Sequence, residues 1–438
     1  MPMVEGAEAY AAAFDALTRE ARVPDPVQAL RQAGFDRFAE LGFPTTKNED
    51  WHYTSVSEIA EQEFTLLTAR TDDVQEAQLE PYRFAGHGWP TIVFVNGRFS
   101  PQLSWLRDLP QGVKIETLAE SWTSSKSLAA EVGRVASMDH AFTALNTAFL
   151  HDGVYIDIAK EAELAVPIHV MYVTDSTVAK GQIHPRTVIV AGRNSKASVV
   201  ESYVSLSDAT HFTNAVTEVT VTRGANLNHY KIQREGMRSF HVGTIEVKQA
   251  QDSHYQSFSF ATGGALSRTN VYTSLDGEGC GATLNGLYMI AGEQHCDHQT
   301  QIIHAQPNCF SRELYKGILD DRSHGVFNGK VYVHPIAQKT DGKQTNKTLL
   351  LSENAKADTK PQLEIFADDV KCTHGATIGQ IDQQALFYMK SRGIDKVTAT
   401  KLLTYAFAAD VLETIELEPL KVELERLTLE RFTGLASA

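Results

Sequence analysis

The sequence predicts a mainly β protein whose body is a parallel β-helix or solenoid, with helical regions before and after it. From Val154 to Asp382, short β-branched, alternating runs such as RTVIVAG, VTEVTVTRG and KVYVHP follow one another. Polar turn signals such as RGANL, DGEGCGA and TDGK separate these runs. No segment with apolar residues at helical spacing lies between these strand-like runs, which argues against alternating βαβ units. A sandwich or barrel is the structural rival, but such domains seldom need so many consecutive strands.

The first region, residues 1–150, is expected to be helical and mixed. Residues 7–22 are rich in alanine, and apolar residues over 27–41 recur at helical spacing until Pro44 ends the run. TIVFVNGRFS predicts a strand followed by an Asn-Gly turn. NEDWHYTSV fits neither an amphipathic helix nor a simple strand. It is either a docking surface or, more commonly for such aromatic residues, an anchor of local packing.

After the β body, assigned to residues 151–382, the pattern becomes helical again. Apolar residues return to helical spacing, and Asp395 is a good N-cap residue. LKVELERLTLERF predicts a last amphipathic helix. The expected domains are therefore 1–150, 151–382 and 383–438, the last of them helical.

Composition excludes two classes of partner. The chain has 438 residues, 42% of them hydrophobic and 21% charged, which is an ordinary globular composition. A formal net charge of −14 argues against binding nucleic acid, which requires a basic face. No apolar run approaches the length needed to cross a bilayer.

The cysteine content points to a reducing compartment. The four cysteines, Cys280, Cys296, Cys309 and Cys372, include no C-x-x-C pair. The start, MPMVEGAEAYAAAFDALTRE, has no basic segment followed by an apolar one, so no secretory signal is expected. We therefore expect free thiols and a cytoplasmic location.

The segment GEQHCDHQTQIIHAQPNCF is the densest group of metal-binding residue types. It contains His295, Cys296, Asp297, His298, His304 and Cys309. If the segment forms one strand, His295 and Asp297 share one face of it, and Cys296 and His298 share the other. A metal centre is one interpretation. The alternative is a polar strand face whose imidazoles bond across neighbouring coils, since the spacing matches none of the common zinc patterns.

Three strings resemble nucleotide-binding motifs but lack the surrounding structure that such motifs require. DGEGCGA has G-x-G-x-x-A spacing, but TLNGLYMI follows and predicts a strand in place of a helix N-terminus. FNGKVYV and DGKQTNKT lack the flanking residues of a phosphate loop, so we expect this chain to bind no ATP. The carboxylate pairs Asp320-Asp321 and Asp368-Asp369 are expected in turns, where they make poor acid–base dyads.

The stretch ADDVKCTHGATIG places two reactive residue types at strand spacing. Cys372 and His374 share one face of a strand, because residues i and i+2 do so. The imidazole and the thiolate could bind a metal together, or the imidazole could activate the thiol. The alternative is that both are ordinary strand residues, with Cys372 a buried structural thiol.

Five long strings, spread over nearly the whole chain, carry a family resemblance. They are PTTKNEDWHYTSV, HPRTVIVAG, HAQPNCFSRELYKGILDDRSHGVFNGKVYVHPIAQKTDGKQTNKTLLLS, KPQLEIFADDVKCTHGATIGQID and LFYMKSRGI. They resemble the SufD family, the β-helix subunit of the SufBCD complex for iron–sulfur cluster assembly. Where this chain has FYMKSRGI, the related SufB chains have a segment similar to FYCxxRGI. Met389 of this chain therefore stands at the position of the SufB cysteine. The likeness is therefore to the D-type subunit.

The resemblance implies an architecture and a set of partners. The core would be a right-handed parallel β-helix between N-terminal and C-terminal helical domains. The chain would be a non-enzymatic scaffold that pairs with a SufB-like subunit through the ends of their β-helices, or with itself when alone. A SufC-like ABC-type ATPase would dock on the C-terminal helices, roughly from Asp382 onward.

The resemblance also implies a site and its cargo. His374 matches the histidine that SufD contributes to the cluster site, with Cys372 two residues before it, and a SufB cysteine completes the site. A transient iron–sulfur cluster would form at that interface, and the complex has been linked to a reduced flavin, although this sequence shows no flavin motif. Such clusters favour thiolate ligands and accept imidazole.

Two functions of other classes compete with the scaffold. A β-helix enzyme acting on polysaccharide would use clustered carboxylates with Arg or Ca²⁺ and is usually exported; the scattered Asp residues and the lack of a signal count against it. A stand-alone metalloprotein would be built on His295, His298, His304 and Cys309.

Overall fold

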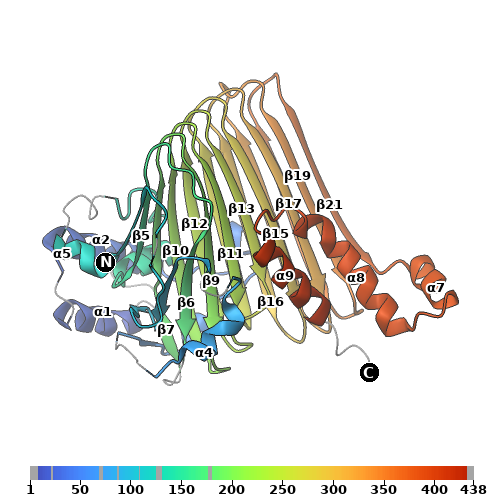
Figure 1. The fold of residues 1–438 in the computed structure, drawn as a ribbon, viewed down its shortest axis with the longest axis horizontal. Coiled ribbons are helices and arrows are strands. Elements are labelled where there is room, and N and C mark those ends of the chain that lie inside the picture. The colour runs from blue at the N-terminus through green and yellow to red at the C-terminus, as the bar shows by residue number, and fades with distance from the viewer. Residues whose placement is uncertain are drawn as a thin grey trace.

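The body of the protein is a two-sheet β-solenoid with helices before and after it, as a computed structural model shows (Figure 1). The structure describes residues 8–20, 23–68, 73–85, 88–107, 109–124, 131–175 and 180–431. Residues 7 and 21–22 of the first expected helix, and 432–438 of the last region, lie outside the described residues. The mainly β class and the solenoid predicted from the sequence are confirmed.

Two sheets, called sheet A and sheet B here, form the solenoid. Sheet A contains β4 (Val113–Thr117), β5 (Gly153–Ile158), β8 (Arg186–Ala191), β10 (His211–Val221), β12 (Phe240–Gln249), β14 (Leu266–Leu275), β16 (His295–His304), β18 (His324–Val333) and β20 (Lys356–Ile365), with β1 (Thr65–Leu66) and β7 (Gly181–Ile183) at its side. Sheet B contains β2 (Thr91–Val95), β3 (Arg98–Phe99), β6 (Ile168–Thr174), β9 (Lys196–Ser205), β11 (Asn226–Arg234), β13 (His254–Ala261), β15 (Gly281–Ile290), β17 (Phe310–Leu319), β19 (Asp341–Leu350) and β21 (Lys371–Gln380).

Successive coils stack in parallel and in register. From β8 onward the chain alternates between the two sheets, so two strands make one coil. In sheet A, Leu266 of β14 pairs with His295 of β16, which pairs with His324 of β18. Equivalent residues of successive coils therefore form columns along the solenoid, and each column faces either inward or outward.

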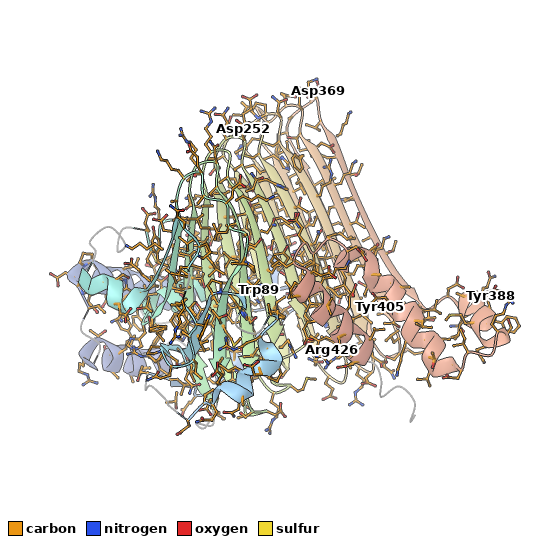
Figure 2. The ribbon with its side chains drawn as sticks, viewed as in Figure 1. Trp89, Asp252, Asp369, Tyr388, Tyr405 and Arg426 are labelled. Carbon is orange, nitrogen blue, oxygen red and sulfur yellow. The ribbon has the colours of Figure 1, made fainter. Side chains whose placement is uncertain are left out.

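In six successive coils, one corner turns through a residue with left-handed backbone conformation. These residues are Asn194, Gly224, Asp252, Gly279, Asn308 and Lys339, with φ between 57° and 73°. Glycine, asparagine and aspartate adopt this conformation most readily, which explains the turn signals in the sequence. Each amide donates to a carbonyl of the next coil; the amide of Asp252, for example, donates to Glu278 at 2.9 Å. Figure 2 shows Asp252 and Asp369 along this edge of the solenoid.

The N-terminal helices cover the outer face of sheet A near the start of the solenoid (Figure 1). Those on sheet A are α1 (Glu8–Glu20), α2 (Asp25–Leu41), η1 (Glu49–Trp51), α3 (Ser57–Glu61), α5 (Leu118–Ser124) and α6 (Ala141–Ala148), whereas α4 (Glu76–Leu79) and η2 (Glu80–Tyr82) lie against sheet B. Helix α2 packs closely on α6 at Gly34, where a Cβ would lie 2.7 Å from the Ala148 amide nitrogen. Aromatic residues dominate this contact, including Phe38, Phe142 and Phe212.

Residues 1–150 also contribute strands to both sheets. Strand β2 pairs with β6 in sheet B, and β4 pairs with β5 in sheet A. The expected strand is β2, and the expected Asn-Gly turn joins it to β3 in a hairpin, with positive φ at both Asn96 and Gly97. The first region therefore continues the solenoid as well as covering it.

A buried ion pair fixes the N-terminal region to sheet A. Arg186 Nη2 of β8 lies 2.7 Å from Glu218 Oε1 of β10, and both side chains are fully buried. The Glu218 carboxylate also accepts the backbone amides of Gly133, Val135 and Ala136 at 2.7 to 3.1 Å. One carboxylate thus joins two strands and the segment that leads into α6.

The segment NEDWHYTSV is fixed to sheet A by a second buried pair. The Arg268 guanidinium lies 3.5 Å from the centre of the Trp51 ring and donates to Asp297 at 2.7 Å. Thr54 donates to the same carboxylate at 2.6 Å. Packing is therefore the role of Trp51, whereas Tyr53 is 38% exposed.

The C-terminal helices lie on the outer face of sheet B (Figure 1). Those that pack on the sheet are α8 (Lys396–Leu412) and α9 (Glu418–Arg431), whereas α7 (Gln383–Ser391) projects past the last coil. Asp395 caps α8 as predicted, since its side chain accepts the Thr398 amide at 3.0 Å. Val411 and Leu424 pack with Phe258 of β13 in one apolar cluster. Among the described residues, no helix has the length and apolar character that a membrane span requires.

Removing the Glu218 carboxylate is expected to destabilise the fold strongly. Glu218→Ala leaves the buried Arg186 guanidinium and three backbone amides without their acceptor, which should cost about 3–5 kcal/mol of unfolding free energy. Urea denaturation of the full chain measures this loss. The control is Glu293→Ala, whose partner Arg322 is 70% exposed; it should change stability by less than about 1 kcal/mol. Equal losses in the two variants would contradict the anchoring role.

Glu313 on β17 should make stability depend on pH. Burial raises its pKa from 4.5 to about 7. Between those values the folded chain holds a proton that the unfolded chain has released, so stability falls as pH rises, by up to about 1.4 kcal/mol per pH unit. The loss is complete above the folded pKa. Glu313→Gln should flatten this slope in unfolding free energies measured across the window, whereas Glu293→Gln controls for loss of a surface charge. A slope equal to that of the wild type would contradict the assignment.

Candidate functional site

The predicted pair Cys372 and His374 lies on the last strand of the solenoid. Within the described part of the chain, β21 pairs with β19 alone and β20 with β18 alone. Both strands of the last coil are therefore edge strands, and each has a row of backbone N–H and C=O groups without a neighbouring strand. This open end of the solenoid lies opposite the N-terminal helices (Figure 1).

Cys372 points into the solenoid at this open end. It pairs in register with Gly342, and its Sγ is 3.4 Å from where a Cβ on that glycine would lie. The side chain is half-buried and packs with Val331 and Leu363. Burial raises the pKa of its thiol, so the proton is held more tightly than on a free cysteine.

His374 is exposed and continues an inward-facing column of polar residues. Glu313 of β17 pairs in register with Gln344 of β19, which pairs with His374. Gln344 Nε2 donates to Glu313 Oε2 at 2.7 Å. Gln344 Oε1 is buried and has no hydrogen-bond partner among the described residues. A histidine that binds a metal through one nitrogen commonly donates its other N–H to such a carbonyl.

The spacing rule thus places the pair as predicted, on one face of one strand. The sequence did not show Gln344 and Glu313 as its neighbours. They stand one and two coils earlier, and the coil lengths that align them become known only from the register. A column of polar residues at inward positions of successive strands is the signal that could have identified them.

Apolar side chains surround the open end. Ile336, Ile365, Phe366 and Ile378 are 61%, 37%, 56% and 44% exposed. Exposed apolar groups beside unpaired strand edges are typical of a surface that another chain covers.

The histidine-rich segment forms the single strand β16, and its side chains separate as the alternation predicts. His295 faces outward, where its Nε2 lies 2.9 Å from Thr54 Oγ1. His298 faces inward and stacks on Tyr288, with Cys296 Sγ 3.8 Å from its Nδ1. His304 contacts Ser311 at 3.0 Å.

These residues are not gathered around one point. Cys309 lies in the turn after the strand. In the described ranges, no group of three or more His, Cys, Asp or Glu side chains is placed to hold a metal ion. Asp321, Asp368 and Asp369 lie in turns or bends, as expected for the carboxylate pairs.

The last helices present a second exposed surface. On α7, Phe387 and Tyr388 are 73% and 59% exposed, and Leu402 of α8 is 42% exposed. Figure 2 shows Tyr388 on α7, at the far end of the molecule from the N-terminal helices. A groove of 610 Å³ separates α7 and α8 from the last coil, with Leu350, Gln380 and other residues along it.

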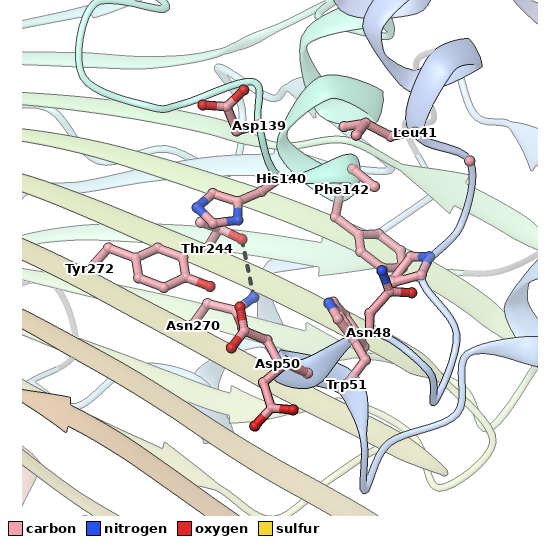
Figure 3. Close-up of a pocket in the computed structure, with 14 residues that line it drawn as sticks. Leu41, Asn48, Asp50, Trp51, Asp139, His140, Phe142, Thr244, Asn270 and Tyr272 are labelled. Atoms are coloured by element: carbon pink, nitrogen blue, oxygen red, sulfur yellow. Dashed lines mark hydrogen bonds between the residues drawn. The ribbon is translucent and has the colours of Figure 1, made fainter. Parts of the chain in front are cut away.

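A smaller pocket lies between η1 and sheet A (Figure 3). Its volume is 240 Å³, and Asp50, Trp51, His140 and Tyr272 are among its lining residues. The His140 ring stacks on Tyr272 with centroids 4.5 Å apart, and burial lowers the His140 pKa. The predicted site residues lie elsewhere.

Comparison with known proteins identifies the family. Residues 171–407 match the SufBD core domain of the SUF system for FeS cluster assembly, and residues 7–170 match the SufBD N-terminal region. The chain is 33% identical to the iron–sulfur cluster assembly protein SufD of Escherichia coli, over 94% of both chains. It is 32% identical to an iron–sulfur cluster assembly SufBD family protein of Synechocystis, over 90% of this chain and 89% of the relative. A SufD of Bacillus subtilis is 29% identical over 65% of each chain.

Both family models and the long alignments agree with the resemblance found in the sequence. Together the two models span residues 7–407, which include the whole solenoid and most of α8. The chain therefore belongs to the SufBD family of iron–sulfur cluster assembly proteins, and within it is similar to SufD.

Proposed function

We propose that this chain is a non-enzymatic scaffold subunit of a SufBCD-type complex, working in the reducing cytoplasm. In this proposal a SufB-like subunit covers the open end of the solenoid, and a nascent iron–sulfur cluster forms between the two chains. The observation that carries the proposal is the position of His374 and Cys372 on β21, an edge strand that ends the solenoid.

The edge itself supports pairing with a similar solenoid. Strands β20 and β21 offer unpaired backbone groups in two sheets at once, at the spacing that another parallel coil would require. The exposed apolar residues Ile365, Phe366 and Ile378 would be removed from water by the same contact. A second copy of this chain offers the same edge, so a homodimer is the expected state without the partner.

The two side chains suit a site that releases its cargo. The cluster is substrate here, and this chain supplies two of its contacts at most. His374 can offer a neutral imidazole nitrogen to iron while its other N–H donates to Gln344 Oε1. Cys372 holds its proton more tightly than a free thiol, so it is the weaker ligand until a metal or a partner's charge displaces that proton.

The C-terminal helices are the proposed docking surface for a SufC-like ATPase. Phe387, Tyr388 and Leu402 are exposed on α7 and α8. In this proposal ATP binds the ATPase subunit, and a reduced flavin acts on the assembled complex.

His374→Ala is expected to abolish cluster loading without preventing assembly. The full chain is co-expressed with its SufB-like and SufC-like partners, the complex is purified without oxygen, and bound iron and sulfide are measured. We expect at least a several-fold loss of cluster in His374→Ala and a smaller loss in Cys372→Ala. Thr373→Ala, on the opposite face of β21, is the matched control. Full loading of an intact His374→Ala complex would overturn the site.

Charging the exposed face of α7 is expected to remove the ATPase and leave the solenoid contact intact. In the double variant Phe387→Asp and Tyr388→Asp, a charged group replaces each apolar contact, so the SufC-like subunit should fail to co-purify while the SufB-like subunit remains. Met237→Asp, an equally drastic change at a 43% exposed residue between β11 and β12, is the control. Retention of the ATPase by the double variant would place the docking surface elsewhere.

A further inference from the structure

Two cysteines occupy consecutive positions in one corner column of the solenoid. The residue after each left-handed turn residue is small and buried, and in successive coils it is Ser195, Ala225, Ser253, Cys280, Cys309 and Thr340. Its carbonyl accepts an amide of the next coil, so the Phe310 amide donates to Cys280 at 3.0 Å and the Asp341 amide to Cys309 at 3.1 Å. Cys280 and Cys309 are therefore direct neighbours, although the sequence separates them widely.

The spacing of the coils suits a disulfide between these two residues. Adjacent strands lie about 4.8 Å apart, within the roughly 4.4–6.8 Å that a disulfide requires between Cα atoms. The two sulfurs interact with each other, and this interaction shifts the pKa values of both thiols. Cys280 Sγ also lies 3.0 Å from the Ala250 carbonyl oxygen, and Cys309 Sγ lies 3.3 Å from that of Gly277.

The two thiols are also chemically unequal. The interaction with Cys309, together with contacts to Ser253 and the turn backbone, lowers the pKa of Cys280 despite burial. The same contact raises the pKa of Cys309. Of the two sulfurs, Cys280 therefore loses its proton more readily to give the thiolate that attacks an oxidant, and Cys309 is the thiol that can resolve the product.

The other cysteines lack this arrangement. Burial raises the pKa of Cys296, and it raises that of Cys372. Cys280 and Cys309 are buried, but the neighbouring turn residues Asp276, Glu278 and Asn308 are exposed, so the pair lies close to the solvent.

We propose that Cys280 and Cys309 are an oxidation site, at which a peroxide produces a disulfide that joins two successive coils. The Cys280 thiolate attacks one peroxide oxygen, the O–O bond breaks, and a sulfenic acid and hydroxide form. The Cys309 sulfur then attacks the sulfenic sulfur and expels its oxygen as water. Two thiols and one hydrogen peroxide thus give one disulfide and two waters. This inference does not depend on the proposed function.

Peptide mapping of the full chain after treatment with hydrogen peroxide tests the proposal. The reduced protein is exposed to a small excess of peroxide, remaining thiols are alkylated, and the digest is analysed by mass spectrometry without reductant. We expect one cross-linked peptide pair containing Cys280 and Cys309, lighter by two hydrogens, while most of Cys296 and Cys372 is still alkylated.

Single substitutions separate the two roles. Serine already occupies this column at Ser253, so Cys280→Ser and Cys309→Ser should fold. Cys309→Ser should accumulate a sulfenic acid at Cys280 that a dimedone probe traps, and Cys280→Ser should leave Cys309 reduced. The proposal is overturned if the wild-type pair stays fully alkylatable, or if Cys296 or Cys372 is oxidised first.

Discussion

The stacking of one coil on the next is the interaction on which the rest of this structure depends. Every strand in the solenoid satisfies its backbone groups through its neighbours, so the stack must begin and end somewhere. At the start, β2 and β4 continue the two sheets and the N-terminal helices cover sheet A. At the end, β20 and β21 remain open. The least satisfied part of the fold is thus the part that carries Cys372 and His374.

The same stacking explains why buried charges are tolerated inside and against the solenoid. A column brings groups of successive coils within hydrogen-bond reach, so inside the solenoid Gln344 of β19 donates to the Glu313 carboxyl of β17 at 2.7 Å, and on the outer face Arg268 of β14 lies 2.7 Å from Asp297 of β16. On the outer face, Glu218 joins two coils to the N-terminal region in the same manner. Because each partner belongs to a different coil, these contacts oppose any slip in register.

The sequence predicted what depends on local spacing and missed what depends on coil length. Alternation placed Cys372 with His374 and separated His295 from His298, and the cap at Asp395 followed from residue type. The corner column that joins Cys280 to Cys309, and the row from Glu313 to His374, were not predicted. Coil lengths vary, and a difference of one residue moves a side chain to the opposite face.

The position of His374, the proposed ligand, on an edge strand would tie metal binding to assembly. In the isolated chain His374 is exposed to water, and no strand holds the outer side of β21. A partner strand that pairs with this edge would fix the backbone of β21, exclude water from the His374 ring and direct its N–H toward Gln344. Each of these effects strengthens the ligand only while the partner is bound. The edge of β21 lacks a neighbouring strand in the isolated chain. The same edge would therefore let the chain release a cluster when the partner leaves.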